Sequence, residues 1–263
     1  MRKYADWRFI TWNLRCDHGQ DPGNTLEDRL PLIRAAMKRE EADVIGFQEL
    51  TPRMLERLEQ EFPDYTFVGR PRDAALLDES CSVAVRHSTV RILDAETVWL
   101  SPTPEIPGSR YPEQSSCPRV RVRVLLQHKE TRETCWFVNT HFDHEGDNAR
   151  VQAQNQLLQE FNELVEHPQA QALIWGGDLN YAPDNKLYPL LVEAGQTELS
   201  EPVQESFHNF GKADPVEKID YLWAPQGQWE IVEEARALTD RAGDTWLSDH
   251  YPVAVTVRIR HDA

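Results

Sequence analysis

Short apolar segments that end abruptly in residue types able to bind a metal ion or a phosphate recur along this chain. Five of them are TWN, ending at Asn13; VIGFQE, ending at Glu49; FVNTHFD, with His141 and Asp143; LIWGGDLN, with Asp178 and Asn180; and LSDH, with Asp249 and His250. KIDYLW adds Asp220 at the beginning of a predicted strand. Carboxylates beside apolar strands are costly to bury unless they are paired or bind a cation. We therefore expect these strand ends to converge on one site.

The apolar periodicity predicts that strands outnumber helices. Strands are expected at residues 8–15, 43–47, 65–68, 81–85, 90–100, 119–127, 135–140, 170–176, 219–224, 229–238 and 251–259. Helices are expected from near Asp28 with Pro31 in the first turn, after Pro52, and from Asp147 to Glu166. Because there is no internal repeat and no linker-like break, residues 1–263 are expected to form a single α/β domain of two sheets with helices outside.

Two stretches near the middle of the chain have open roles. A loop with five prolines between residues 102 and 118 is too long for a hairpin, so it either covers a site or runs over the surface. The strand that follows places Arg119, Arg121 and Arg123 on one face. A solvated outer face is favoured over a track for a polyanion, because the chain is strongly acidic.

The charge balance restricts the kinds of partner. The chain has 28 lysines and arginines against 44 aspartates and glutamates, a net charge of −16. This argues against binding of nucleic acid through a broad basic surface. It leaves nucleic-acid hydrolysis open, since carboxylates can bind Mg²⁺, which then receives the phosphate.

The sequence shows no feature of a membrane or secreted protein. No apolar run approaches the ~20 residues that span a bilayer, and the first residues lack the apolar region of a secretory signal. The cysteines at 16, 81, 117 and 135 are far apart and form no CxxC motif, so reduced thiols are expected instead of a zinc site or a disulfide framework. We expect a cytoplasmic protein with no membrane partner and no evident protein partner.

Each candidate residue is ambiguous when it is considered alone. Asn13 is of a type that commonly forms turns, and a glutamate after a strand, such as Glu49, is ordinarily solvated. His141 and His250 could each be satisfied histidines of the core. The GGDLN and SDHYPV segments are more specific, and the occurrence of all the segments together in this order makes coincidence a poor explanation.

The motifs TWNLR, DVIGFQE, NTHFDH, GGDLN, KIDYLW and LSDHYPV, in that order across nearly all of the chain, resemble the endonuclease/exonuclease/phosphatase superfamily. VWLSPTPEIPGS is similar to a bacterial branch of metal-dependent hydrolases within it. The resemblance implies a four-layered α/β sandwich, like that of deoxyribonuclease I, in which two mixed β-sheets pack together between helices. PGSRYPEQSSCPR lacks the Trp-Asp pair of that branch, so the resemblance does not extend to a substrate.

The resemblance also implies a metal-binding side of the site. Glu49 resembles the principal Mg²⁺ ligand, and Mn²⁺ is a possible substitute. Asn13 and Asp249 match positions that contact the metal or its water. Asp17 lies in a similar segment, but no role is implied for it.

A catalytic side is implied in the same way. Asp178 matches the carboxylate that orients or deprotonates the attacking water, and Asn180 matches the amide that holds this water or a phosphate oxygen. His141 and His250 match the histidines at the phosphate, and Asp220 matches the carboxylate that orients His250. Asp143, Arg119 and Arg150 lie in similar segments; Arg119 could contact phosphate or brace a strand.

These residue types suit a Mg²⁺-dependent phosphoesterase that hydrolyses a phosphodiester or phosphomonoester by in-line attack of an activated water. The alternative within this class is a nuclease or exonuclease acting on DNA or RNA. A catalytically inactive binding module would be expected to lack Glu49, Asp178 or His250, and all three are present. A glycosidase with two carboxylates would leave the histidines without a role.

Overall fold

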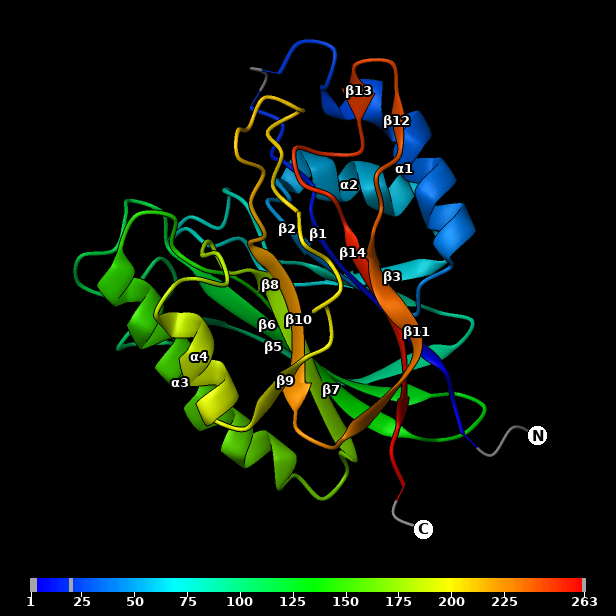
Figure 1. The fold of residues 1–263 in the computed structure, drawn as a ribbon, viewed down its shortest axis with the longest axis vertical. Helices are drawn as coiled ribbons and strands as arrows, with labels where there is room; N and C mark the ends of the chain where they lie inside the picture. Colours follow the sequence, from blue (N-terminus) through cyan, green and yellow to red (C-terminus); the bar gives the residue numbers. More distant parts are fainter. Residues whose placement is uncertain (1–3, 19–20, 262–263) are drawn as a thin grey trace.

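Two six-stranded β-sheets pack against each other in the computed structural model, which describes residues 4–18 and 21–261 (Figure 1). The first sheet has the order β11-β14-β1-β2-β4-β3. Its strands are β1 (Trp7–Asn13), β2 (Val44–Gln48), β3 (Tyr65–Val68), β4 (Val83–Arg86), β11 (Trp229–Ala237) and β14 (Val253–Ile259). The pairing of β1 with β14 brings segments near the two ends of the chain into one sheet. The expected single domain stays a prediction.

The second sheet has the order β5-β6-β7-β8-β10-β9. Its strands are β5 (Val90–Trp99), β6 (Val120–His128), β7 (Thr134–His141), β8 (Ala172–Asp178), β9 (Gln196–Glu198) and β10 (Asp220–Pro225). Both sheets are mixed: β1 and β2 are parallel, as are β7 and β8, whereas β1–β14 and β8–β10 are antiparallel.

Helices cover the outer face of each sheet (Figure 1). They are α1 (Leu26–Glu40) and α2 (Pro52–Glu61) on the first sheet, and α3 (Asp147–Val165) and α4 (Leu187–Glu193) on the second. One apolar cluster lies between the sheets, and two others lie between a sheet and its helices. These layers confirm the predicted four-layered α/β sandwich of two mixed sheets. No helix in the described ranges has both the length and the apolar character needed to cross a membrane.

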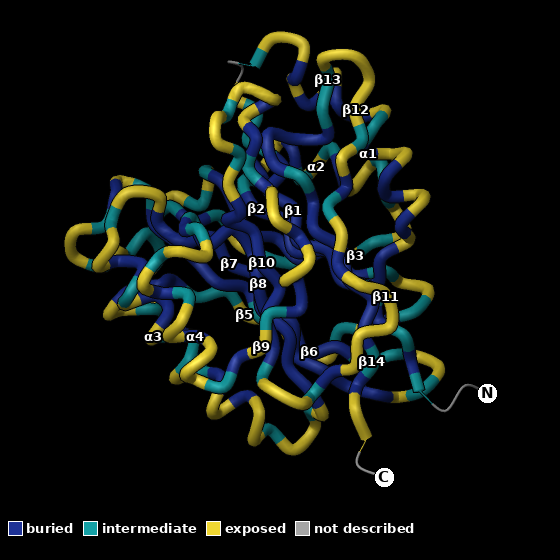
Figure 2. Tube along the Cα trace, viewed as in Figure 1, coloured by how far each residue is buried: buried dark blue, intermediate teal, exposed yellow. Residues whose placement is uncertain are grey.

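The alternation of side chains along the strands explains how polar residues reach one end of the sandwich. On β1, Trp7 and Phe9 belong to the cluster between the sheets, and Asn13 follows on the same face at the end of the strand. On β7, Phe137 belongs to that cluster, and His141 follows in the same way. β1 and β7 are buried along nearly their whole length (Figure 2). The apolar part of each strand thus fixes the position of its polar end.

A buried group of polar side chains joins the two sheets next to that end. The Gln48 side-chain amide donates to Asn139 Oδ1 at 2.7 Å and to Thr11 Oγ1 at 3.1 Å, and the Asn139 amide donates to the Phe47 carbonyl at 2.8 Å. The sheets approach closely here. A Cβ atom on Gly46 would lie only 2.7 Å from Asn139 Oδ1. Only glycine fits at this position without displacing the polar group.

The first helix begins earlier than predicted. Thr25 and Asp28 form a capping box, which starts α1 at Leu26. Pro31 therefore lies inside the helix in its second turn, and its prediction in the first turn was wrong. The short elements α4, β9, β12 (Arg241–Ala242) and β13 (Thr245–Trp246) were not predicted.

The arginines of β6 lie neither on a solvated face nor on a polyanion track. Arg121 is 4% exposed and pairs with Glu160 of α3 at 2.6 Å and with Glu96 of β5 at 2.8 Å. Arg123 pairs with the same two glutamates. The expectation of a solvated face was wrong because α3 covers this face and supplies a carboxylate to it.

We predict that Gly46→Ala lowers the free energy of unfolding by about 1–3 kcal/mol, because the added methyl group overpacks the space between the sheets. Urea denaturation measures the loss. A Cβ at this position would also lie 2.9 Å from Phe137 Cζ. Phe137→Leu should therefore relieve part of the clash, so that the double variant loses less than the sum of the single variants. Additive losses, or no loss for Gly46→Ala, would contradict this account.

Candidate active site

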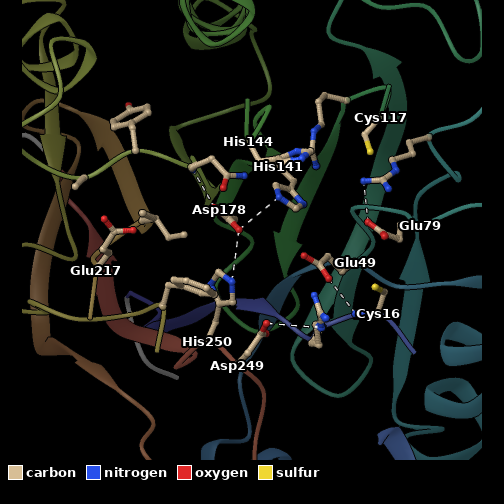
Figure 3. A pocket seen from close by; sticks show the side chains of 18 residues that line it. Cys16, Glu49, Glu79, Cys117, His141, His144, Asp178, Glu217, Asp249 and His250 are labelled. Carbon is tan, nitrogen blue, oxygen red and sulfur yellow. Dashed lines mark hydrogen bonds and ion pairs between the residues drawn. The ribbon is translucent and has the colours of Figure 1, made fainter. Parts of the chain in front are cut away.

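The polar strand ends surround one cleft of about 530 Å³ (Figure 3). Six of the eight predicted site residues line it: Glu49, His141, Asp178, Asn180, Asp249 and His250. The other two, Asn13 and Asp220, are hydrogen-bonded to lining residues from behind. The structure thus brings together the full predicted set.

Sheet register accounts for this convergence on the side of the second sheet. Parallel pairing of β7 with β8 places His141 opposite Asp178, and antiparallel pairing of β8 with β10 places Asp220 opposite Asp178. Gly177 has a φ of +139° and its position leaves no room for a Cβ, which would lie 1.8 Å from the Thr140 carbonyl oxygen. The glycine before Asp178 therefore allows the close approach of β7 to β8.

The Asn13 side chain connects the two sides of the cleft. Its amide nitrogen donates to Glu49 Oε1 at 3.0 Å and to Asp178 Oδ2 at 3.0 Å, and its Oδ1 accepts from the Arg15 backbone N–H at 3.0 Å. Glu49 follows β2 with a φ of +65° and also accepts from the Cys16 backbone N–H at 3.0 Å. In this arrangement Asn13 orients the Glu49 carboxylate, and its direct contact with a metal stays a prediction.

Asp178 lies between the two histidines. Its Oδ2 is 3.4 Å from His141 Nε2 and 3.8 Å from His250 Nε2 (Figure 3). Burial, together with the negative charge of Asp220, raises the pKa of Asp178 to about 7. This carboxyl group can therefore take up or release a proton near neutral pH.

The two histidines have opposite charge preferences. Burial alone would lower the pKa of His250, but the adjacent Asp220, 2.7 Å from Nδ1, raises it to about 10. Burial and the positive charges of Arg119 and Arg72 lower the pKa of His141 well below its ordinary value. His250 is therefore an imidazolium and His141 a neutral imidazole, which is how one site holds a charged and a neutral donor side by side.

The loop after Glu198 holds the His250–Asp220 pair in place. Ser206 Oγ accepts from the Asp220 backbone N–H at 3.0 Å, and the Ser206 carbonyl accepts from the Tyr251 backbone N–H at 2.7 Å. The ring of Phe207 packs against the imidazole of His250, with 4.9 Å between the ring centroids. Asp220 and His250 are far apart in the sequence. The loop is hydrogen-bonded to the backbone of Asp220 and of Tyr251, the residue after His250.

Asn180 is bound to its surroundings through both of its nitrogens. Its backbone N–H donates to Asp178 Oδ1 at 2.9 Å, and its side-chain amide donates to the Phe142 carbonyl at 3.0 Å. With a φ of +51°, it turns the chain directly after β8. It lines the cleft, and its proposed hold on water or phosphate stays a prediction.

The donor chemistry around Glu49 fits a hard divalent cation. Burial raises the pKa of Asp249, and the negative charge of Glu49 raises it further. Burial alone would also raise the pKa of Glu49, but hydrogen bonds from Cys16 and Asn13 keep it below its usual value. Two carboxylates that repel each other at a cleft wall are stabilised by a cation with oxygen ligands, and Mg²⁺ prefers such ligands. The residues present therefore fit the ion that the motifs imply.

Asp178, Asp220 and His250 form a second group of possible metal ligands in the cleft, but their arrangement is better explained by proton transfer. Ligand atoms of Asp178, Asp220 and His250 all lie within 4.8 Å of one another. However, His250 Nδ1 is already engaged by Asp220 at 2.7 Å. This hydrogen bond favours a proton-handling pair over a metal-binding triad.

Three of the four residues without an implied role, Asp17, Asp143 and Arg150, make hydrogen bonds that hold loops in place. Asp17 accepts from Thr51 Oγ1 at 2.7 Å and from Arg53, which ties the loop after β1 to the beginning of α2. Asp143 accepts from the backbone N–H of Ser115 at 3.1 Å, in the proline-containing loop. That loop reaches the cleft, since Cys117 lines it. Arg150 donates to the carbonyl of Asp143 at 2.7 Å.

Arg119 and Arg72 are among the residues that line the cleft. Arg119 lines it and lies 2.9 Å from His144 Nδ1. Arg72 and Glu79, which sequence reasoning missed, form an ion pair at 2.8 Å in the same wall. They lie in an irregular segment between β3 and β4, where no strand-end pattern marks them.

The chain belongs to the endonuclease/exonuclease/phosphatase family, whose family model matches residues 10–250. No curated protein sequence matches it. An endonuclease/exonuclease/phosphatase from Bacteroides vulgatus has 25% identity and a TM-score of 0.89, over 97% of this chain and 100% of that one. A Bacteroides thetaiotaomicron mannosyl-6-phosphatase has 24% identity and a TM-score of 0.86, over 95% and 99%. The Bacteroides vulgatus neighbour confirms the expected bacterial branch.

A more distant structure shares the same fold. D. rerio TDP2, solved in complex with a single-strand DNA product, has 17% identity and a TM-score of 0.71, over 96% of this chain and 99% of that one.

We predict that Asp220→Asn lowers the pKa of His250 from about 10 towards its ordinary value of 6.5, because the substitution removes the charge that favours the imidazolium. NMR of the imidazole nitrogens during a pH titration measures the shift. Glu217→Gln, which changes an exposed carboxylate of the same cleft, serves as the control and should leave His250 unchanged. An unaltered His250 titration in Asp220→Asn would contradict the assignment.

Proposed function

We propose that this protein is a Mg²⁺-dependent phosphoesterase that cleaves a phosphate ester by in-line attack of water. The observation that carries the proposal is the position of Asp178 between His141 and His250, in a cleft whose other wall holds Glu49 and Asp249. Family members are phosphoester hydrolases, which supports the proposal.

Asp178 is proposed to orient the attacking water and accept its proton. With a pKa of about 7, it can act as a base near neutral pH. The Asn13 amide and the Asn180 backbone N–H each hold one of its oxygens, so its position is fixed before substrate binds. Fixed geometry of this kind lowers the entropic part of the barrier.

The histidines are proposed to bind the phosphoryl oxygens. The charged imidazole of His250, supported by Asp220, would stabilise the negative charge that builds on these oxygens in the transition state. The neutral imidazole of His141 would donate one hydrogen bond without competing for the proton. Glu49 and Asp249 would hold Mg²⁺, which supplies electrostatic stabilisation of the phosphate when it is bound.

A compact phosphate ester is the proposed substrate class. The arginines of β6 are paired with Glu96 and Glu160, so they offer no track for a polyanion. The similarity to a mannosyl-6-phosphatase is consistent with a phosphorylated small molecule. The shared fold with TDP2, solved with a DNA product, keeps a nuclease as the second candidate.

A panel of sugar phosphates, small phosphodiesters and single- and double-stranded nucleic acids, each supplied with Mg²⁺, tests the reaction and the substrate class. Hydrolysis of a small ester, absent in Asp178→Asn, would support the main proposal. Hydrolysis of DNA or RNA alone would favour the nuclease. Turnover of none of them would overturn the assignment of the reaction.

We predict that Asp178→Asn and His250→Ala each reduce kcat by roughly 10³-fold on any accepted substrate, because the groups act as a unit on one transition state. Steady-state kinetics measures the effect. Asp184→Asn changes an exposed carboxylate in the loop that follows β8 and should keep normal turnover. Near-normal kcat in either site variant would remove that residue from the proposed mechanism.

We also predict that chelation with EDTA abolishes turnover and that added Mg²⁺ restores it. Glu49→Gln should raise the Mg²⁺ concentration needed for half-maximal activity, because an amide is a weaker ligand than a carboxylate. Glu56→Gln, at an exposed position of α2, is the matched control. Full activity after exhaustive chelation would rule out the metal requirement.

A further inference from the structure

A second group of ligand-type side chains lies beside Glu49 and has no part in the proposed mechanism. Cys16 and His18 come from the loop after β1, and Glu79 precedes β4. The cysteine sulfur, one imidazole nitrogen and one carboxylate oxygen all lie within 4.8 Å of one another. Cys16 and Glu79 line the cleft next to Glu49 (Figure 3).

The backbone and its hydrogen bonds hold two of these donors in place. The Cys16 backbone N–H donates to Glu49 Oε2 at 3.0 Å, which fixes the loop at this residue. Glu79 is 7% exposed, and its Oε2 is bound to Arg72 at 2.8 Å. Its Oε1 faces the other way, 3.6 Å from His18 Nε2. One oxygen of a buried carboxylate that Arg72 holds in place thus lies near the His18 imidazole.

The charge of the surroundings favours a cation. Burial raises the pKa of Glu79, and the nearby negative charge of Glu49 raises it further, whereas Arg72 offsets only part of this effect. His18 has an exposed side chain, so its imidazole can adjust to a ligand without disturbing the core. A cation between these groups would relieve the repulsion of the two carboxylates.

The types of donor select the kind of cation. A thiolate, an imidazole and a carboxylate form a ligand set that suits Zn²⁺ and related transition metals, whereas Mg²⁺ takes oxygen ligands. Three protein ligands with a fourth position open to solvent are common for zinc. No sequence motif marks this site, because the group contains a single cysteine and therefore no CxxC spacing.

We propose that Cys16, His18 and Glu79 form a binding site for Zn²⁺, distinct from the Mg²⁺ site at Glu49 and Asp249. Binding replaces the thiol proton of Cys16 with a sulfur–metal bond and releases this proton to solvent. A cation held here adds positive charge to the wall where the phosphate would bind, a consequence that rests on the proposed phosphoesterase activity.

Titration with Co²⁺ in excess Mg²⁺ tests the site without any measurement of turnover. Co²⁺ bound to a thiolate gives a near-ultraviolet charge-transfer absorption, which oxygen ligands do not give. We expect this band to saturate at one equivalent and to disappear when Zn²⁺ is added. Cys16→Ser should abolish it, and His18→Ala should weaken Co²⁺ binding by at least the roughly 10-fold that loss of an outer partner costs.

Cys117→Ser is the matched control, because Cys117 lines the same cleft. It should keep the band. Circular dichroism checks that each variant is folded. No band in the wild-type protein, a band retained in Cys16→Ser, a band lost in Cys117→Ser, or unchanged affinity in His18→Ala would overturn the proposal. Because the readout is spectroscopic, its failure is distinguishable from failure of the phosphoesterase proposal.

Discussion

The side-chain amide of Asn13 connects the two sheets at the cleft, and the candidate site depends on this contact. One nitrogen donates to Glu49 from the first sheet and to Asp178 from the second, each at 3.0 Å. Beside Asn13, the buried hydrogen bond between Gln48 and Asn139 also joins the two sheets. The side-chain nitrogen and oxygen of Asn13 both have partners, which makes this buried polar group favourable. The sandwich thereby fixes the distance between Glu49 and Asp178, which lie on the proposed metal-binding and catalytic sides of the cleft.

The close packing of these side chains also determines the protonation states of Asp178 and His250. The negative charges of Asp220, Asp249 and Asp178 all raise the pKa of His250, and the charge of Asp220 also raises the pKa of Asp178. The carboxyl group of Asp178 therefore has a pKa near 7, and His250 stays charged. Arg15, 3.7 Å from Asp249 Oδ2, offsets part of the repulsion between Glu49 and Asp249, and a divalent ion would offset more of it. The geometry and the electrostatics thus favour the same reaction class.

The sequence predicted the layers and the site better than the details of individual elements. The strand-end residues could be found because a period of two places Asn13, His141 and Asp178 on the same face as the apolar residues before them. Pro31 was placed wrongly because the capping box at Thr25 outweighs the proline. The partners of Arg121 could not be predicted, since Glu96 and Glu160 lie on separate elements. Arg72 and Glu79 were missed because their positions depend on loop structure.

A divalent ion and a phosphate are proposed to bind side by side in this cleft, and a crystal structure with Mn²⁺ and inorganic phosphate tests this directly. Anomalous scattering locates Mn²⁺ independently of the protein atoms. We expect an Mn²⁺ peak coordinated by Glu49 and Asp249, with the phosphate between the imidazoles of His141 and His250. Mn²⁺ bound away from both carboxylates, with no phosphate at the histidines, would contradict it.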